Sequence, residues 1–205
     1  MECKVQYAGG MNEGITELIG RRLRELRAAS GLSLDALAHK SGVSRSNISL
    51  IERGQSSPTA VVLDKLSSAL GVSVASMFEA APGASPPAAP SPLARVADQP
   101  VWSDPASGYV RRNVSPPGVS PLQLVDVVFP AGQRVAFETS ERDADIHQLI
   151  WMIDGTMEIG HGANRWQLQA GDCLAVRLDA PIAFHNPGAK AARYLVALTG
   201  ATPWR

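Results

Sequence analysis

The stretch from Leu32 to Gln55 constrains this chain more than any other, because it encodes two short helices joined by one tight turn. Ser33 is placed to cap the first helix, since its hydroxyl can accept a backbone N–H that the first turn leaves unpaired. Gly42 stands where that helix must end in a left-handed residue, and the apolar Val43 follows it. Ser44 can cap the second helix in the same way. The stretch therefore predicts a helix, a glycine turn and a second helix.

The second of these helices has one apolar face and one polar face. Ile48 and Ile51 recur at helical spacing and should point into a core. Two helices joined by a three- or four-residue turn that contains glycine form the helix-turn-helix unit. The major groove of DNA admits a helix of this kind. The pattern favours DNA binding over a bundle that only packs, and the outward positions that would face the groove are Arg45, Ser46, Asn47 and Ser49.

Residues 15–80 as a whole resemble the XRE-type (phage-repressor-like) helix-turn-helix family, without a gap. One position departs from the family: Leu34 stands where a Gln that often contacts phosphate is usual. The resemblance implies a five-helix, lambda-repressor-like DNA-binding bundle. Its motifs are Gly31-Leu32-Ser33, Leu37-Ala38, Gly42-Val43-Ser44, Ile48-Ser49, Ile51-Glu52-Arg53-Gly54, Pro58-Thr59, Gly71-Val72-Ser73 and Met77-Phe78.

The resemblance also implies which side chains touch a double-stranded DNA operator. Base edges would be read by the four outward residues named above. Residues 15–80 are mildly basic within a chain whose 19 basic and 19 acidic residues balance, which suits a dimer that reads a specific site better than indiscriminate binding. Phosphate positioning would fall to Ser33, Ser44, Arg53, Gln55 and Ser56.

Composition divides the chain into four parts. Residues 1–14 form a predicted flexible tail, and residues 81–100 a linker rich in Pro and Ala. Closely spaced prolines cannot hold a helix, so this linker should act as a semi-rigid spacer. It separates the helical part from a second domain, residues 101–205.

Composition also excludes several classes of protein. No run of about 18 apolar residues is present to cross a membrane, and the N-terminal segment lacks the apolar core of a secretory signal. The two cysteines, Cys3 and Cys173, lie far apart and do not suggest a disulfide framework. We therefore expect a cytoplasmic protein.

From Val101 onward helical periodicity gives way to short β-rich runs between Gly, Pro and Asn. Asp154-Gly155 marks a hairpin turn between two of them. Many short strands without helices predict a β-sandwich or barrel. The clearest runs are 122–129, 146–153, 156–159, 165–168, 173–178, 182–185 and 193–198.

This second half resembles the cupin barrel, a double-stranded β-helix or jelly roll. Gly171 and Asn186 match the ends of the second cupin motif, whereas Ile182 stands where a metal-binding His is usual. The first motif can start at Gly132 and end at Gly155. The resemblance implies the scaffold of a cupin.

In both cupin motifs, other residues stand at the positions of the usual metal ligands. Glu138 and Ser140 occupy the two His positions of the first motif, and Gln148 occupies its Glu position. His147 and His185 remain as nearby candidates, although strand alternation should turn them outward if Gln148 and Ile182 point inward. We expect no cofactor, no divalent metal and no enzymatic activity.

The barrel instead predicts a small-molecule pocket, mostly apolar with a few convergent polar groups. A buried Glu138 would favour a cationic or hydroxyl-bearing ligand, because an unpaired buried carboxylate is costly; the alternative places Glu138 at a rim in water. Trp151 and Leu149, on the opposite face, could form a dimer surface or pack in a core. The predicted pocket residues are Glu138, Ser140, Gln148, Ile150, Met152 and Ile182.

Together the two resemblances suggest a bacterial transcriptional regulator. A homodimer would place two recognition helices in successive major grooves, and the barrel would sense a small-molecule effector or hold the dimer. Two alternatives stay open: a metal-dependent cupin enzyme fused to a DNA-binding module, and a scaffold-type DNA-binding protein of a toxin–antitoxin or phage circuit.

Overall fold

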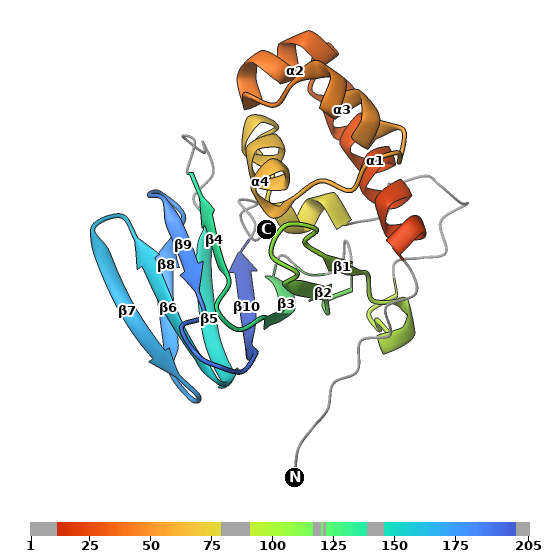
Figure 1. Cartoon of the computed structure of the whole chain (residues 1–205). Helices are drawn as coiled ribbons and strands as arrows, with labels where there is room; N and C mark the ends of the chain where they lie inside the picture. Colours follow the sequence, from red (N-terminus) through yellow and green to blue (C-terminus); the bar gives the residue numbers. More distant parts are fainter. Residues whose placement is uncertain (1–11, 79–90, 117–119, 121, 139–145, 200–205) are drawn as a thin grey trace.

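The computed structural model describes residues 12–78, 91–116, 120, 122–138 and 146–199. Helices come first in the chain and antiparallel strands follow, so the predicted fold class is confirmed (Figure 1). No helix among the described residues has both the length and the apolar character needed to cross a lipid bilayer.

The helical part contains four α-helices and one 3-10 helix, where five helices were predicted. The helix α1 begins at Asn12, earlier than the predicted Ile15, because a first helical turn needs no apolar residue. The last element is a short 3-10 turn in which the Ser73 hydroxyl accepts the Ser76 N–H at 3.2 Å. The bounds are α1 (Asn12–Ala29), α2 (Leu34–Ser41), α3 (Arg45–Glu52), α4 (Ala60–Ala69) and η1 (Val74–Phe78).

The turn between α2 and α3 has the geometry that its sequence predicts. The Ser33 hydroxyl accepts the Ala36 N–H at 3.1 Å, which caps α2. Gly42 ends that helix with a φ of 67°, in the left-handed region that costs glycine no strain. The Ser44 hydroxyl then accepts the Asn47 N–H at 3.3 Å and caps α3.

The β part consists of two antiparallel sheets. Phe184 of one sheet stacks on Tyr194 of the other with ring centroids 6.0 Å apart, so the sheets face each other across a common core. The first sheet has the order β1 (Val101–Ser103), β2 (Val110–Asn113), β3 (Leu122–Phe129), β10 (Ala192–Thr199), β5 (His147–Asp154), β8 (Cys173–Arg177). The second has the order β4 (Arg134–Phe137), β9 (Ile182–His185), β6 (Thr156–His161), β7 (Asn164–Gln169).

Three strands escaped the sequence analysis: β1, β2 and β4. Each has only three or four residues, so the sequence offers little alternation by which to recognise it, although the equally short β9 was predicted. The longer β5 alternates as predicted. Its inward side chains are buried and its outward ones exposed: Gln148, Ile150 and Met152 against His147, Leu149 and Trp151.

The helical and β parts pack directly against each other, which the predicted spacer did not suggest. Of that spacer, residues 81–90 lie outside the described part, and 91–100 include the 3-10 helix η2 (Val96–Asp98). Phe78 of η1 contacts Trp102 of β1 at 5.9 Å between ring centroids. The Ala60 N–H, at the start of α4, donates to the Asp104 carboxylate at 3.0 Å, and α4 also contacts β4 (Figure 1).

Candidate nucleic-acid interface and ligand cavity

The helix α3 separates its side chains by face. Ile48 and Ile51 are fully buried against the other helices. On the opposite side Arg45 and Ser46 are exposed, while Asn47 and Ser49 are half-buried. The four predicted base-reading residues therefore lie on the outward side of a helix whose other side is anchored in the core.

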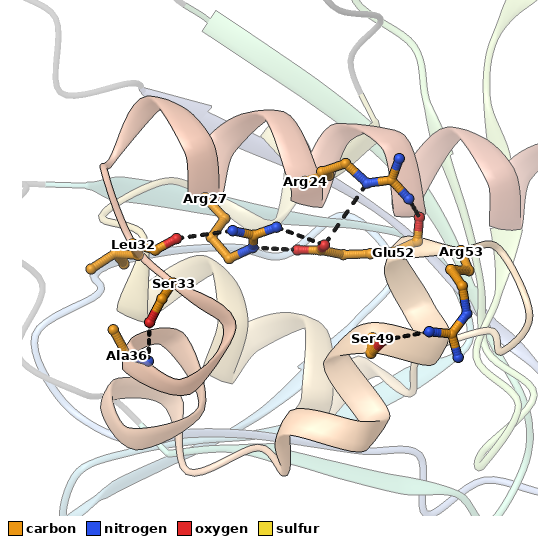
Figure 2. Close-up of polar contacts among 8 residues, drawn as sticks. All are labelled: Arg24, Arg27, Leu32, Ser33, Ala36, Ser49, Glu52 and Arg53. Atoms are coloured by element: carbon orange, nitrogen blue, oxygen red, sulfur yellow. Dashed lines mark hydrogen bonds and ion pairs between the residues drawn. The ribbon is translucent and has the colours of Figure 1, made fainter.

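A buried ion pair holds α3 against α1 (Figure 2). Arg27 donates from Nε to Glu52 Oε1 at 2.6 Å and from its second terminal nitrogen to Oε2 at 2.9 Å. The same guanidinium donates to the Leu32 carbonyl at 2.9 Å, and Arg24 donates to the Glu52 carbonyl at 2.6 Å. Hydrogen bonding to Glu52 raises the pKa of Arg27 above its ordinary value. A bidentate pair of this geometry fixes the direction of α3 as well as its position.

The helices α1 and α3 also approach each other closely at Gly20. A Cβ at this position would meet the Ile51 carbonyl oxygen at 2.3 Å and the Gly54 nitrogen at 3.2 Å. Only glycine leaves room for this crossing. Neither Gly20 nor the Arg27–Glu52 pair was identified from the sequence, because their partners lie about 30 residues away along the chain.

The predicted phosphate contacts are reachable from solvent. Ser33 and Ser44 are exposed and serve as helix caps. Arg53 is exposed and donates from Nε to Gln55 Oε1 at 2.9 Å. It also donates to the Ser49 hydroxyl (Figure 2). Gln55 is exposed and Ser56 is half-buried. Ser44 precedes α3 and Arg53, Gln55 and Ser56 follow it, whereas Ser33 lies at the start of α2.

Arg45 already has a partner on α2. Its Nε lies 3.2 Å from Asp35 Oδ1, and the two side chains are 64% and 77% exposed. Exposed pairs of this kind contribute about 0–1 kcal/mol. The pair can therefore be exchanged for a nucleic-acid contact at small cost.

A cavity of about 110 Å³ lies between the two parts of the molecule. Its walls come mainly from the inward faces of both sheets, and include Val125, Phe137 and Phe184. Three residues of the helical part complete the lining: Asp64, Ser73 and Val74. This volume is below the roughly 150 Å³ of an apolar cavity that binds benzene, so the space suits only a small organic molecule.

Polar groups line this cavity from the two strands on either side of β3 and from the turn before one of them. Arg111 of β2 and Tyr194 of β10 occupy the same cross-strand row, because each pairs with Val127 of β3. Tyr109 precedes Arg111 by two residues and interacts with its guanidinium. Burial raises the pKa of Tyr109 to about 12 and that of Tyr194 well above its ordinary value, so both hydroxyls stay protonated. Burial lowers the pKa of Arg111.

The structure places the predicted pocket residues differently. Gln148 and Ile182 line the cavity. Ile150 and Met152 are fully buried but lie in the packed core and not in the cavity wall. Glu138 is exposed, because Phe137 takes the inward position at the end of β4 and alternation turns the next residue outward. Ser140 lies outside the described residues.

The residues around the cavity do not fit the divalent metal of the cupin family. His147 is exposed on the outer face of β5. His185 Nδ1 lies 2.8 Å from Glu158 Oε2, on the outer side of the other sheet. Ile182 offers no donor, and the Arg111 cation faces the same space. In the described part of the chain, no three His, Cys, Asp or Glu side chains cluster as metal ligands.

Tyr109 and Arg111 are the principal cavity residues that the sequence analysis missed. They are spaced two apart, as expected for two side chains on one face of a strand. The strand that carries Arg111 reads Val-Arg-Arg-Asn, which looks like a solvated loop in sequence. A buried arginine in so polar a run is recognisable only once the neighbouring strands are placed.

Comparisons with known proteins support the helical half most directly. The helix-turn-helix family HTH_3 matches residues 23–76. The uncharacterized HTH-type transcriptional regulator y4dJ of Sinorhizobium fredii (strain NBRC 101917 / NGR234) is 39% identical over 57 residues, which are 28% of this chain and 74% of y4dJ. The chain spans about half the length of the other curated relatives that it matches in this region.

Two further comparisons extend over both halves. The HTH-type transcriptional regulator PuuR of Escherichia coli (strain K12) is 26% identical over 183 residues, covering 89% of this chain and 95% of PuuR. The crystal structure of an HTH_3 family transcriptional regulator from Vibrio cholerae superposes with a TM-score of 0.71 at 22% identity, covering 95% of this chain and all of that one. At 22% identity, the superposition on the Vibrio cholerae structure shows only that the two folds are alike.

Proposed function

Because this chain belongs to the XRE-type helix-turn-helix family of transcriptional regulators, we propose that it binds a specific double-stranded DNA operator under the control of a small-molecule effector. The observation that supports the proposal most is the arrangement of α3. Its polar side faces outward, while Glu52 and the buried isoleucines hold it from behind. A helix presented in this way enters the major groove, where each base pair shows a distinct pattern of donors and acceptors.

In this proposal the contacts divide by type. Base edges are read by Arg45, Ser46, Asn47 and Ser49, and phosphates are positioned by Ser33, Ser44, Arg53, Gln55 and Ser56. A guanidinium reads guanine by two hydrogen bonds to O6 and N7. Arg45 is the residue we assign to this role, since its present partner Asp35 is exposed and easily replaced.

We propose that the protein acts as a homodimer. A dimer sets two recognition helices about 34–36 Å apart on one face of the duplex. Trp151 and Leu149 support this proposal, since they are 49% and 47% exposed on the outer face of the six-stranded sheet. Exposed apolar residues of this size that gather on one face are typical of an interface.

The cavity is the proposed effector site, and the barrel is assigned a binding role and no catalytic one. Its lining combines apolar walls with a few buried polar groups, as ligand sites do. Residues of the helical part close it on one side, so an occupant would contact both halves of the molecule. Such an occupant changes operator affinity only if it binds one arrangement of the halves more tightly than another.

Arg45→Ala tests the DNA-binding proposal once genome-wide mapping of bound sites has identified the operator. We expect a loss of about 1–3 kcal/mol on operator DNA, which is about 5- to 150-fold in Kd, and little change on random duplex. Fluorescence anisotropy with both duplexes at several salt concentrations measures this difference.

Arg53→Ala is the matched control. As a phosphate contact it should weaken binding to both duplexes equally and reduce the salt slope by about one. Wild-type protein that binds both duplexes equally would contradict the proposal. An equal loss on both duplexes for Arg45→Ala would make Arg45 a phosphate contact instead.

A further inference from the structure

Arg111 is a buried cation at the border between the two halves. It is 8% exposed, and its guanidinium carbon lies 4.8 Å from the centroid of the Phe78 ring of η1. Its Nε has no hydrogen-bond partner within the described residues. Arg111 is also one of the residues that line the cavity.

The known neighbours of Arg111 do not neutralise its charge. The Phe78 ring offers a cation–π contact, and the Tyr109 hydroxyl stays protonated and neutral. No ion pair joins Arg111 to a carboxylate in the part of the chain that the structure describes. Its neighbour Arg112 differs in this respect, since it donates to Asp126 at 2.6 Å. A buried charge without an opposite charge is costly. A ligand that brings a negative charge to Arg111 would remove this cost, which favours its binding.

We propose that the cavity binds a small organic monoanion, a carboxylate on an apolar body, whose carboxylate pairs with Arg111. This inference rests on the proposed effector site and names the chemical class of its ligand. A guanidinium and a carboxylate form two parallel hydrogen bonds. The protonated hydroxyls of Tyr109 and Tyr194 add further donors, while Val125, Phe137 and Phe184 surround the apolar body. The cationic or hydroxyl-bearing ligand expected from the sequence depended on an inward Glu138, which the structure places outside. Asp64, a carboxylate among the lining residues, belongs to the helical part.

The position of Arg111 gives this ligand a route to the helical part. The guanidinium lies against Phe78, which contacts Trp102. Asp64, Ser73 and Val74 form part of the same cavity wall. A carboxylate that draws the guanidinium toward itself competes with the Phe78 contact, so occupancy alters the interface that positions the DNA-binding helices.

The test uses the full-length protein and isosteric probes at pH 7. Benzoate and 3-methylbutanoate supply the anions, their amides the neutral forms, and benzylamine and 3-methylbutylamine the cations. Thermal shift identifies binders, since a ligand selective for the native state raises Tm, and calorimetry gives Kd. We expect a carboxylate to bind at least about tenfold more tightly than its amide or amine.

Three variants locate the binding. Arg111→Met keeps the apolar stem and should weaken carboxylate binding by at least about tenfold. Without ligand its Tm should equal or exceed that of the wild type, because a buried charge has been removed. Arg111→Lys keeps the charge but not the planar fork and should retain part of the affinity. Ile182→Trp fills the cavity and should abolish binding.

Three results would overturn the inference: amides or amines that bind as tightly as the carboxylates, Arg111→Met that binds a carboxylate unchanged, or Arg111→Met that lowers Tm strongly without ligand. If only amides or amines bind, and Ile182→Trp prevents their binding, the proposal of an effector site is kept but its ligand is not a carboxylate. If no probe of any charge binds, or if Ile182→Trp binds all of them, the proposal that this cavity is an effector site is contradicted as well.

Discussion

At the scale of single residues, the most consequential side chain of the helical part is Glu52. It is the second residue of the Ile51-Glu52-Arg53-Gly54 motif and points inward, toward Arg27 of α1. Its neighbour Arg53 points outward. Adjacent positions of one motif therefore serve the core and the surface respectively, which the motif alone does not reveal.

Glu52→Met should lower the free energy of unfolding by about 3–5 kcal/mol, because Arg27 would be left as a largely buried charge without its partner. Urea denaturation measures the loss. The double variant Arg27→Met with Glu52→Met should be more stable than Glu52→Met alone, since it removes both charges. Glu17→Met on the exposed side of α1 is the control, with an expected change within about 0.5 kcal/mol. A double variant no more stable than the single one would contradict the role of the charge.

At the scale of elements, the crossing of α1 and α3 sets how the recognition helix is presented. Gly20 allows the two backbones to approach, and the Arg27–Glu52 pair locks the same contact further along. The helix α2 is joined to α3 by the short turn after Gly42 and by the exposed Arg45–Asp35 pair, which contributes only about 0–1 kcal/mol. The orientation of α3 is thus determined more by α1, which is distant in sequence, than by its partner in the helix-turn-helix motif.

Gly20→Ala should destabilise the protein by about 1–3 kcal/mol, because the new methyl group overlaps the Ile51 carbonyl and backbone cannot move aside easily. The usual effect of this change within a helix is a gain of up to about 1 kcal/mol. Gly14→Ala in the same helix supplies that control, since a Cβ there meets no atom within 4 Å. Thermal or urea unfolding should show opposite signs for the two variants. The same sign in both would contradict the close approach at Gly20.

At the scale of the whole molecule, two surfaces of the barrel differ in what they contact. One surface is joined to the helices by the Asp104 cap on α4, by the contact between Phe78 and Trp102, and by the cavity that both parts line. The other surface, on the outer side of the six-stranded sheet, exposes Leu149 and Trp151. The first surface suits communication between the halves, and the second suits the proposed dimer.

Trp151→Glu should convert the proposed dimer into a monomer, because it places a charge in the centre of an apolar interface. Sedimentation equilibrium at micromolar concentration measures the mass, and operator affinity should fall together with dimer formation. Leu93→Glu is the control, since Leu93 is 58% exposed and lies outside the sheet. A wild-type monomer, or a Trp151→Glu variant that remains dimeric, would contradict this interface.

The helix-turn-helix and the strand alternation could be predicted because they depend on residues close together in the chain. Ser33, Gly42 and Ser44 act within one or two turns of their own position, and the outward face of α3 follows from the spacing of Ile48 and Ile51. The long β5 shows the same alternation in sequence and in structure. Local hydrogen bonding and periodicity are sufficient for such features.

Tertiary structure alone decided how the cavity is lined. Motif spacing pointed Glu138 inward, yet the register of β4 against β9, in which Phe137 pairs with Ile182, gives that place to Phe137. Arg111 reads as a solvated residue of a short polar segment, and it is buried because β3 and the Phe78 ring cover it. Strand register and the packing of the two halves depend on contacts between residues far apart in the chain, and a shift of one residue exchanges the inner and outer faces of a strand.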